Sequence, residues 1–250
     1  MHIHTFTKSS FSVLLKDCGW NPVRWSGWGD RFSWLGLGPL RRRFPGLRPW
    51  ANGSLFDGLV GSIVGQSISV AATAVTERRL CALLAEPLSV AGRQFWPAPR
   101  ADHLASADPA LVRQSGVTWR RAEALVVAAQ AFRDARMPSD AAARAAPDAA
   151  RAALRSLPLV GPWTAESALL WGLGEADAYP PGDAALLRAA RLAYARPDLD
   201  HAGLNALAAS WAPHRGWAAR RLWTALLGPA GEDRSRGVEG SRSREVTVPF

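Results

Sequence analysis

Residues 154–173 read "LRSLPLVGPWTAESALLWGL" and carry the most specific pattern in the chain. We expect one helix to end near Leu157 and a second helix to begin near Pro162, with the tight turn "PLVG" between them. Proline suits the first position of a helix, where its missing N–H costs nothing. Gly161 permits a positive φ angle and the close approach of another molecule. The segment therefore predicts two helices joined by a short hairpin.

The start of the second helix is a candidate anion site. The first N–H groups of a helix have no partner within the helix, and the helix dipole adds partial positive charge there. In this chain those groups belong to Gly161, Trp163 and Thr164. Backbone N–H groups arranged in this way suit a phosphate group.

The composition limits the kind of partner. The chain has 250 residues, 48% of them hydrophobic, which suffices for the core of one large domain or two small ones. Its 30 Lys and Arg residues exceed its 21 Asp and Glu residues and give a net charge of +9, and only Lys8 and Lys16 are lysines. The excess favours an anionic partner, nucleic acid first, and a general arginine-rich composition is the alternative explanation. Candidate phosphate contacts, which solvated helix faces explain as easily, are Arg120, Arg121, Arg215, Arg220 and Arg221.

The cysteines and the chain start bear on the compartment. Cys18 and Cys81 are too few for a disulfide framework or for the four-cysteine site of an iron–sulfur cluster. We expect free thiols in a reducing environment. The first residues lack the basic start and apolar run of a signal peptide, and no stretch is apolar for long enough to span a bilayer. We therefore expect a cytoplasmic protein with no membrane partner and no iron–sulfur cluster.

Three parts of the chain differ in composition and in predicted secondary structure. Residues 1–50 hold five of the 12 tryptophans among Gly, Pro and Arg, and predict a short irregular or β-like segment that packs on the rest, with "HIHTFT" as a strand. Residues 51–228 show helical periodicity, with about nine or ten helices and no convincing strand pair, so the predicted fold is all-α. Residues 229–250 predict a flexible tail, in which "EVTVPF" reads as a strand.

Two features together resemble a known family. The pattern L-P-x-V-G-x-x-T-A resembles the helix-hairpin-helix motif, and "PPGD" brings Asp183 22 residues after Gly161. A hairpin followed at this distance by P-x-D is similar to the helix-hairpin-helix DNA glycosylases. "SLFDGLVGSIVGQSISVAATAV" and "WRRAEALVVAA" resemble further blocks of the bacterial 3-methyladenine DNA glycosylase II branch, so the resemblance covers roughly residues 50–228. It implies two helical lobes with the active-site cleft between them.

Asp183 has two roles open to it. An Asp before "AALLRAA" is what the start of a helix prefers, so the side chain is a candidate N-cap. The resemblance implies a catalytic carboxylate, which stabilises an oxocarbenium-like sugar or activates the attacking water. The two roles are compatible, because the N-terminus of a helix favours a negative charge.

The resemblance also implies an aromatic base pocket, with Trp163 and Trp211 as its walls. An indole face attracts a positively charged alkylated purine such as 3-methyladenine by stacking and cation–π contact, and core packing is the plain alternative for any tryptophan. Ser167 stands where the family often has a tyrosine, and Tyr179 is a candidate to fill the space.

The position of Trp163 also bears on strand cleavage. In the strand-cleaving members of the family a lysine stands two residues after the hairpin glycine, where this chain has Trp163. No lysine follows Lys16, so no Schiff base can form from the hairpin segment. We therefore expect a monofunctional enzyme.

The stretch "GQSIS" matches the place of the family's wedge, the residue that enters the gap left by a flipped-out base. The wedge position falls on Ser67, with Ile68 as its rival and Gln66 as a candidate partner for the opposite strand; an ordinary helix break is the alternative. The resemblance further implies a monovalent cation, Na⁺ or K⁺, at three main-chain carbonyls of the hairpin, those of Arg155, Leu157 and Val160. No cofactor is expected to take part in catalysis.

These expectations combine into one functional hypothesis. The chain is expected to be a monomeric, monofunctional glycosylase of base excision repair that hydrolyses the N-glycosidic bond of alkylated purines flipped out of double-stranded DNA. The alternatives are a glycosylase for another lesion, such as hypoxanthine or ethenoadenine, and a helix-hairpin-helix module that only binds DNA. Asp183 and Trp163 at the positions that match the family's motif favour the enzyme, because a protein that only binds DNA needs neither residue.

Overall fold

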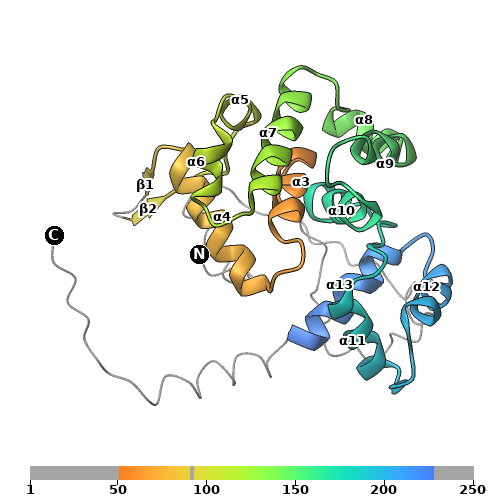
Figure 1. The fold of residues 1–250 in the computed structure, drawn as a ribbon. Helices are drawn as coiled ribbons and strands as arrows, with labels where there is room; N and C mark the ends of the chain where they lie inside the picture. Colours follow the sequence, from red (N-terminus) through yellow and green to blue (C-terminus); the bar gives the residue numbers. More distant parts are fainter. Residues whose placement is uncertain (1–50, 91–92, 228–250) are drawn as a thin grey trace, which may run out of the picture.

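A computed structural model describes residues 51–90 and 93–227 (Figure 1). The predictions for residues 1–50 and 229–250, including their two short strands, lie outside the described residues. Within the described residues, the chain forms eleven α-helices, one π-helical segment and one short β-hairpin. This largely confirms the all-α prediction. No described helix combines the length and apolar character that a membrane crossing requires.

Figure 1 shows two groups of helices, α3 to α10 in the upper part of the view and α11 to α13 below them. The first lobe contains α3 (Leu55–Val64), α4 (Val70–Leu84), α5 (Ala101–Ala105), α6 (Pro109–Arg113), α7 (Trp119–Arg133), α8 (Asp140–Ala145), α9 (Pro147–Arg155), α10 (Pro162–Ala168) and the π-helical continuation η2 (Leu169–Leu173). The second lobe contains α11 (Ala184–Ala193), α12 (His201–Ala209) and α13 (Arg215–Leu227).

The β-hairpin corrects the expectation that the helical region holds no strand pair. Strand β1 (Leu88–Val90) pairs antiparallel with β2 (Arg93–Phe95), with Leu88 opposite Phe95. Each strand is three residues long. The alternation of apolar and polar residues that reveals a strand needs about four to eight residues, so these segments are too short to carry a periodic signal.

Helix α3 is the centre of the first lobe and packs against α7, α10 and η2. Ser54 caps it, because the Ser54 hydroxyl accepts the Asp57 N–H at 3.0 Å. The four-residue spacing of Leu55, Leu59 and Ile63 turns all three side chains inward, and each is fully buried. One apolar stripe thus anchors the lobe.

The hairpin between α9 and α10 forms where the sequence predicts it, with one correction. Helix α10 begins at Pro162 as expected, and α9 ends at Arg155, two residues earlier than expected. Gly161 has φ −85°, whereas Leu159 has φ 60°. Gly161 therefore does not use the positive φ that glycine permits, because an N-cap residue needs an extended backbone, and the left-handed turn lies two residues earlier.

Two glycines let α3 and η2 approach backbone to backbone. A Cβ on Gly172 would lie 2.5 Å from the Ser54 carbonyl oxygen and 3.1 Å from the Leu55 Cα. A Cβ on Gly58 would lie 2.3 Å from the Ala168 carbonyl oxygen. Because backbone atoms cannot step aside as a flexible side chain can, both positions require glycine. The helix then ends at Gly174, whose φ of 70° is the expected left-handed stop.

Replacing Gly172 with alanine should therefore destabilise the fold. The added methyl group forces α3 and η2 apart, and we expect the free energy of unfolding to fall by about 1–3 kcal/mol, as for other overpacked cores. Urea denaturation of Gly172→Ala measures the loss. Gly161→Ala is the matched control, because nothing lies within 4 Å of its Cβ position. Equal stability of the two variants would contradict the close packing of α3 on η2.

Candidate active site

The Asp183 carboxylate is held at the start of α11. Gly182, with φ 78°, follows two prolines and turns the chain into the helix. Asp183 is the N-cap, since its Oδ1 accepts the Leu186 N–H at 2.6 Å. The capping prediction is confirmed, and the side chain is half-buried rather than enclosed.

Two indole rings from distant parts of the chain point their N–H groups at the same carboxylate. Trp163 Nε1 of α10 donates to Asp183 Oδ2 at 2.9 Å, and Trp223 Nε1 of α13 donates to Asp183 Oδ1 at 3.2 Å. A carboxylate oxygen has two lone pairs, so among the described residues Oδ1 is saturated by its two donors whereas Oδ2 keeps one acceptor site. The carboxylate is thus fixed in orientation and still able to accept one further hydrogen bond.

A stack of aromatic rings supports Trp223 from behind. Trp171 lies on Trp223 with ring centroids 5.5 Å apart and planes 26° from parallel. The Arg220 guanidinium lies 4.5 Å from the centre of the Trp171 ring, and its Nη2 donates to the Leu170 carbonyl at 2.9 Å. Burial lowers the pKa of Arg220 to about 10, which leaves the cation charged at neutral pH. The indole that touches Asp183 is therefore held by a cation–π and stacking arrangement.

Trp223, not Trp211, is the second tryptophan of this site. The Trp211 side chain is fully buried and its ring meets that of Tyr179 edge to face at 6.3 Å. The predicted place of Trp211 in a base pocket does not fit this burial, because the ring reaches no surface. Sequence reasoning missed Trp223, which follows Trp211 by twelve residues, and nothing local distinguishes the two.

Ser167 and Tyr179 are also buried, with 2% and 8% exposure. The Tyr179 hydroxyl donates to Asn205 Oδ1 at 2.8 Å, so its polar end is already engaged. Burial, and next the Asp183 charge, raise the pKa of Tyr179 to about 12. Ser167 lies one helical turn beyond Trp163, and its Oγ makes no hydrogen bond within the described residues. Tyr179 is thus a buried residue close enough to feel the Asp183 charge, and it does not line an open pocket.

Gln66 ties the "GQSIS" loop to the hairpin. Its Nε2 donates to the Leu159 carbonyl at 2.8 Å and to Thr164 Oγ1 at 2.9 Å. Its own main-chain carbonyl accepts from Arg121 Nη2 at 2.5 Å. Both Nε2 hydrogens are engaged within the protein, so only the side-chain oxygen of Gln66 is left to pair with an opposite strand, and the predicted contact stays a prediction. Ser67 and Ile68 follow it and are exposed, and Ser67 has the left-handed φ of 57°.

The hairpin presents its amides as predicted from the sequence. Gly161 and Pro162 are exposed, and no side chain caps α10, so the first N–H groups at Gly161, Trp163 and Thr164 have no helical acceptor. Thr164 is 3% exposed and its hydroxyl accepts a hydrogen bond from Gln66, so Gly161 and Trp163 are the more accessible of the three residues. The carbonyls predicted to hold a cation lie just before this point; that of Leu157 accepts the Val160 N–H at 3.3 Å.

Four of the five arginines predicted as phosphate contacts are engaged within the protein. Arg220 and Arg221 are more than nine-tenths buried, and Arg215 binds the Asp177 carboxylate through two nitrogens at 2.9 and 2.6 Å. Arg121 holds the Gln66 carbonyl. Arg120 alone of the five is exposed without a described partner group. The partners in these contacts are carboxylates and carbonyls of other elements. The spacing of the arginines along their own helices therefore could not reveal them.

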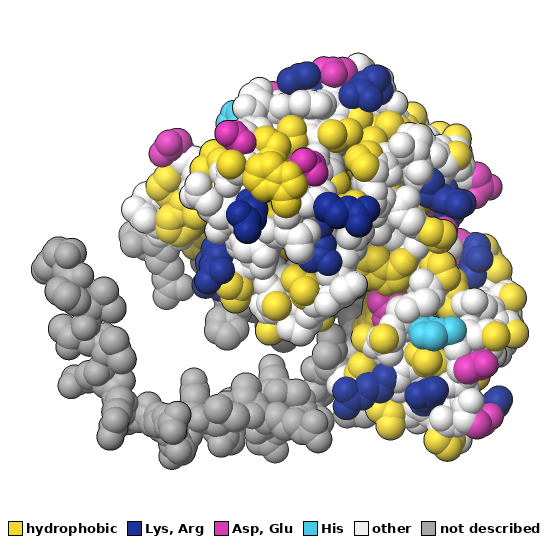
Figure 2. Space-filling model, in the orientation of Figure 1, with side chains coloured by type: hydrophobic (Ala, Val, Ile, Leu, Met, Phe, Trp, Pro, Cys, Tyr) yellow, Lys and Arg dark blue, Asp and Glu magenta, His cyan; other side chains and the backbone are white. Residues whose placement is uncertain are grey.

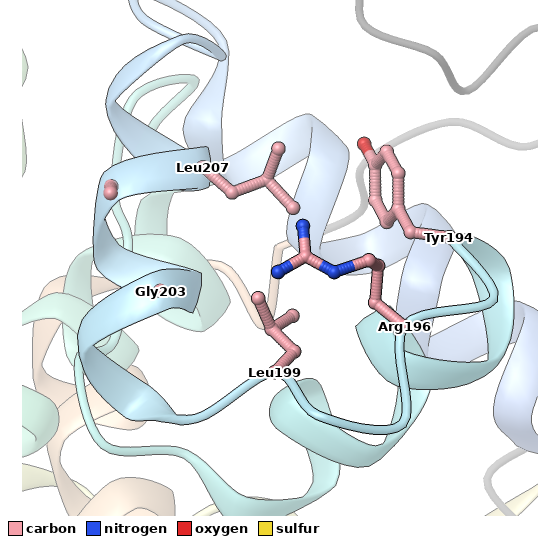
Figure 3. A pocket seen from close by; sticks show the side chains of 6 residues that line it. Tyr194, Arg196, Leu199, Gly203 and Leu207 are labelled. Carbon is pink, nitrogen blue, oxygen red and sulfur yellow. The ribbon is translucent and has the colours of Figure 1, made fainter.

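A cavity in the second lobe lies away from these residues. It measures about 580 Å³ and is lined by Tyr194, Arg196, Leu199, Gly203, Ala206 and Leu207. Figure 3 shows Arg196 extending between Leu199, Leu207 and the Tyr194 ring. None of the predicted site residues lines it, so the chemistry of Asp183 is independent of this cavity. The described residues also contain no cluster of His, Cys, Asp and Glu suited to a metal ion.

Known proteins resemble this chain in sequence and in fold. A Mycobacterium tuberculosis "Probable bifunctional transcriptional activator/DNA repair enzyme AlkA" is 32% identical over 69% of this chain and 34% of its own length. The Escherichia coli "DNA-3-methyladenine glycosylase 2" is 30% identical over 75% of this chain and 63% of its own length. The chain thus spans about a third of the first relative and under two thirds of the second. No protein-family model matches the chain.

A solved structure supports the fold. The Schizosaccharomyces pombe 3-methyladenine DNA glycosylase Mag1, in complex with abasic DNA, superposes with a TM-score of 0.64 at 21% identity, over 76% of this chain and 90% of that chain. The hairpin, the two helical lobes and the carboxylate between them define the class of the helix-hairpin-helix DNA glycosylases. The chain belongs to this superfamily, in the 3-methyladenine DNA glycosylase II branch.

The geometry around Asp183 predicts how Tyr179 titrates. In the folded chain its phenolate should form near pH 12 instead of near pH 10, because burial and the Asp183 charge both oppose ionisation. The stabilisation from the neutral phenol is fully present below about pH 10 and is lost as the pH rises through about 12. Ultraviolet difference absorbance of phenolate, measured in the folded and the guanidinium-unfolded chain, follows the titration.

Asp183→Asn should lower the pKa of Tyr179, because one of the two causes that raise it disappears. Tyr179→Phe identifies which absorbance step belongs to Tyr179, since burial also raises the pKa of Tyr194. Asp200→Asn is the matched control, a change of the N-cap of α12. An Asp183→Asn titration identical to that of the control would show that the carboxylate does not face Tyr179.

Proposed function

We propose that the chain is a monofunctional DNA glycosylase that acts on alkylated purines of the 3-methyladenine type. The observation that supports this most directly is the half-buried Asp183 carboxylate, fixed by the Leu186 amide and by two indole N–H groups. A structural cap needs only the first of these bonds. The two tryptophans orient a carboxylate that already caps α11, which favours a role for this carboxylate beyond stabilising the fold.

Asp183 Oδ2 retains the acceptor site that the chemistry requires. When the N-glycosidic bond breaks, its electron pair leaves with the base and positive charge develops on the sugar. A fixed carboxylate stabilises this charge, and it can accept a proton from the water that attacks the anomeric carbon. An alkylated purine is cationic and leaves as a neutral base, so the site needs no general acid for this class of lesion.

The base pocket follows from the same hydrogen bonds. Trp163 commits its N–H edge to Asp183 and is only half-buried, so a face of its ring remains for contact with a base. Trp223 is 9% exposed and stacks on Trp171, so its part is to hold the carboxylate. An indole face binds a cationic purine by stacking and cation–π attraction. The stacking of Trp223 on Trp171 keeps the Asp183 carboxylate in place when the pocket is empty. Hypoxanthine and ethenoadenine are the alternative substrates, to be separated by assay.

The hairpin and the "GQSIS" loop are proposed to hold double-stranded DNA, with the protein as a monomer. The amides of Gly161, Trp163 and Thr164 bind one phosphate group. The carbonyls of Arg155, Leu157 and Val160 suit a monovalent cation; the Leu157 carbonyl accepts the Val160 N–H with one lone pair, and its second lone pair suits an ion. Ile68, an apolar side chain with 39% exposure, is a better wedge than Ser67, which forms the left-handed corner of the loop.

The Asp183→Asn variant tests the proposal. Asparagine keeps an oxygen for the helix cap but removes the charge, so single-turnover base release should fall by about 100-fold or more while DNA affinity is retained. The assay incubates the protein with duplexes that each contain one damaged base and reveals abasic sites with alkali. Asp200→Asn, the same change at the cap of α12, should keep the wild-type rate. A wild-type rate in Asp183→Asn would overturn the catalytic role.

The absence of strand cleavage has its own test. No lysine follows Lys16, and Trp163 occupies the position two residues after the hairpin glycine. We expect no covalent protein–DNA complex on borohydride reduction, because no imine forms from the hairpin. Gel electrophoresis of the reduced mixture measures this. A trapped band would refute the monofunctional assignment and direct attention to the terminal amine or to Lys8 and Lys16.

A further inference from the structure

The arginines of the described residues differ in whether a carboxylate balances their charge. Six of them lie within 4.0 Å of a carboxylate oxygen, namely Arg100, Arg133, Arg136, Arg151, Arg196 and Arg215. Arg79, Arg113 and Arg120 are exposed, and none of them forms an ion pair with another described residue. Exposed cations that no carboxylate balances are available to an anionic partner.

These three arginines lie around one turn of the first lobe. A Cβ on Gly116 would meet Arg79 Nη1 at 3.6 Å, so the side chain of Arg79 on α4 reaches the turn between α6 and α7. Gly116 and Arg113 line one shallow cavity of about 320 Å³. Arg120 follows four residues after Gly116, in the first turn of α7. Figure 2 shows dark blue Lys and Arg side chains gathered over α4 and the start of α7.

An exposed aromatic ring stands among these charges. Trp119, the first residue of α7, is 48% exposed although it is large and mostly apolar. Its Nε1 donates to Glu123 Oε1 at 2.7 Å, which holds the ring against the surface and reduces the entropy cost of binding. A fixed aromatic ring beside uncompensated arginines is the combination that nucleic-acid surfaces use, since the ring packs on sugars and bases while the cations bind phosphates.

This surface is joined to the hairpin by hydrogen bonds. Arg121, next to Arg120, holds the Gln66 carbonyl, and the Gln66 side chain holds Leu159 and Thr164 of the hairpin. A ligand on the first turn of α7 and a phosphate on the hairpin amides therefore contact parts of one connected framework. One duplex that crosses both would bind more tightly than either contact alone allows.

We propose that Arg79, Arg113, Arg120 and Trp119 form a second DNA-binding surface, which contacts the backbone of the duplex beyond the damaged nucleotide. The three arginines bind phosphate groups, and Trp119 packs on a deoxyribose between them. The inference rests on the proposed function in one respect, that duplex DNA is the partner. It adds a contact on the first lobe, away from the hairpin amides and from Asp183.

The salt dependence of binding tests this surface. The triple variant Arg79→Gln/Arg113→Gln/Arg120→Gln is compared with wild type for binding to one duplex over a series of KCl concentrations. Removal of one phosphate interaction should reduce the slope of log K against log salt by about 0.9, so the slope of the triple variant should fall by about 2–3 units and its affinity by about 10–100-fold at about 0.1 M salt. Trp119→Ala should weaken binding several-fold with an unchanged slope, because it removes no charge.

The matched control is Arg100→Gln/Arg133→Gln/Arg196→Gln, which removes the same charge from ion-paired arginines. We expect its slope to remain within about half a unit of wild type, since these arginines bind no phosphate group. An equal reduction of the slope in both triple variants would show a general effect of net charge and overturn the inference. An unchanged slope in the first variant would overturn it as well. A wild-type protein that does not bind duplex DNA would refute the proposed function itself.

Discussion

The hydrogen bonds to the Asp183 carboxylate hold the candidate site together. They join three elements that are far apart in the chain: the cap of α11, Trp163 from α10 and Trp223 from α13. Trp163 belongs to the first lobe and Trp223 to the second, so one side chain connects the two lobes at their junction. Two indole donors satisfy a half-buried carboxylate without supplying a countercharge, which leaves its negative charge available to a cationic sugar or base.

The rest of the site depends on how firmly these elements are held. Gly58 and Gly172 bring α3 and η2 into backbone contact, and η2 carries Trp171, on which Trp223 stacks. Gln66, just beyond the end of α3, fixes the hairpin from the other side. The hairpin, the loop with Ile68 and the aromatic wall therefore share one framework. A site built on helices in this way keeps its geometry before the ligand arrives.

The sequence by itself determined the local features. The hairpin, the start of α10 at Pro162 and the cap at Asp183 depend on a few neighbouring residues, and all are present as predicted. Short-range preferences decide such features, because caps, prolines and helical spacing act over one or two turns. The order and spacing of the motifs also identified the family. Three-residue strands such as β1 and β2 carry too little pattern to be seen in this way.

Only the tertiary structure decided which side chains reach the carboxylate. Trp211 and Trp223 lie twelve residues apart, yet one is enclosed against Tyr179 and the other donates to Asp183. Arg220 and Gln66 likewise contact partners that are distant in the chain, and for Arg220 this contact and its burial take the place of the phosphate contact that the sequence predicted. Periodicity shows which face a residue occupies on its own helix. What lies opposite that face depends on how the helices pack, and that packing is set by contacts between residues distant in the sequence.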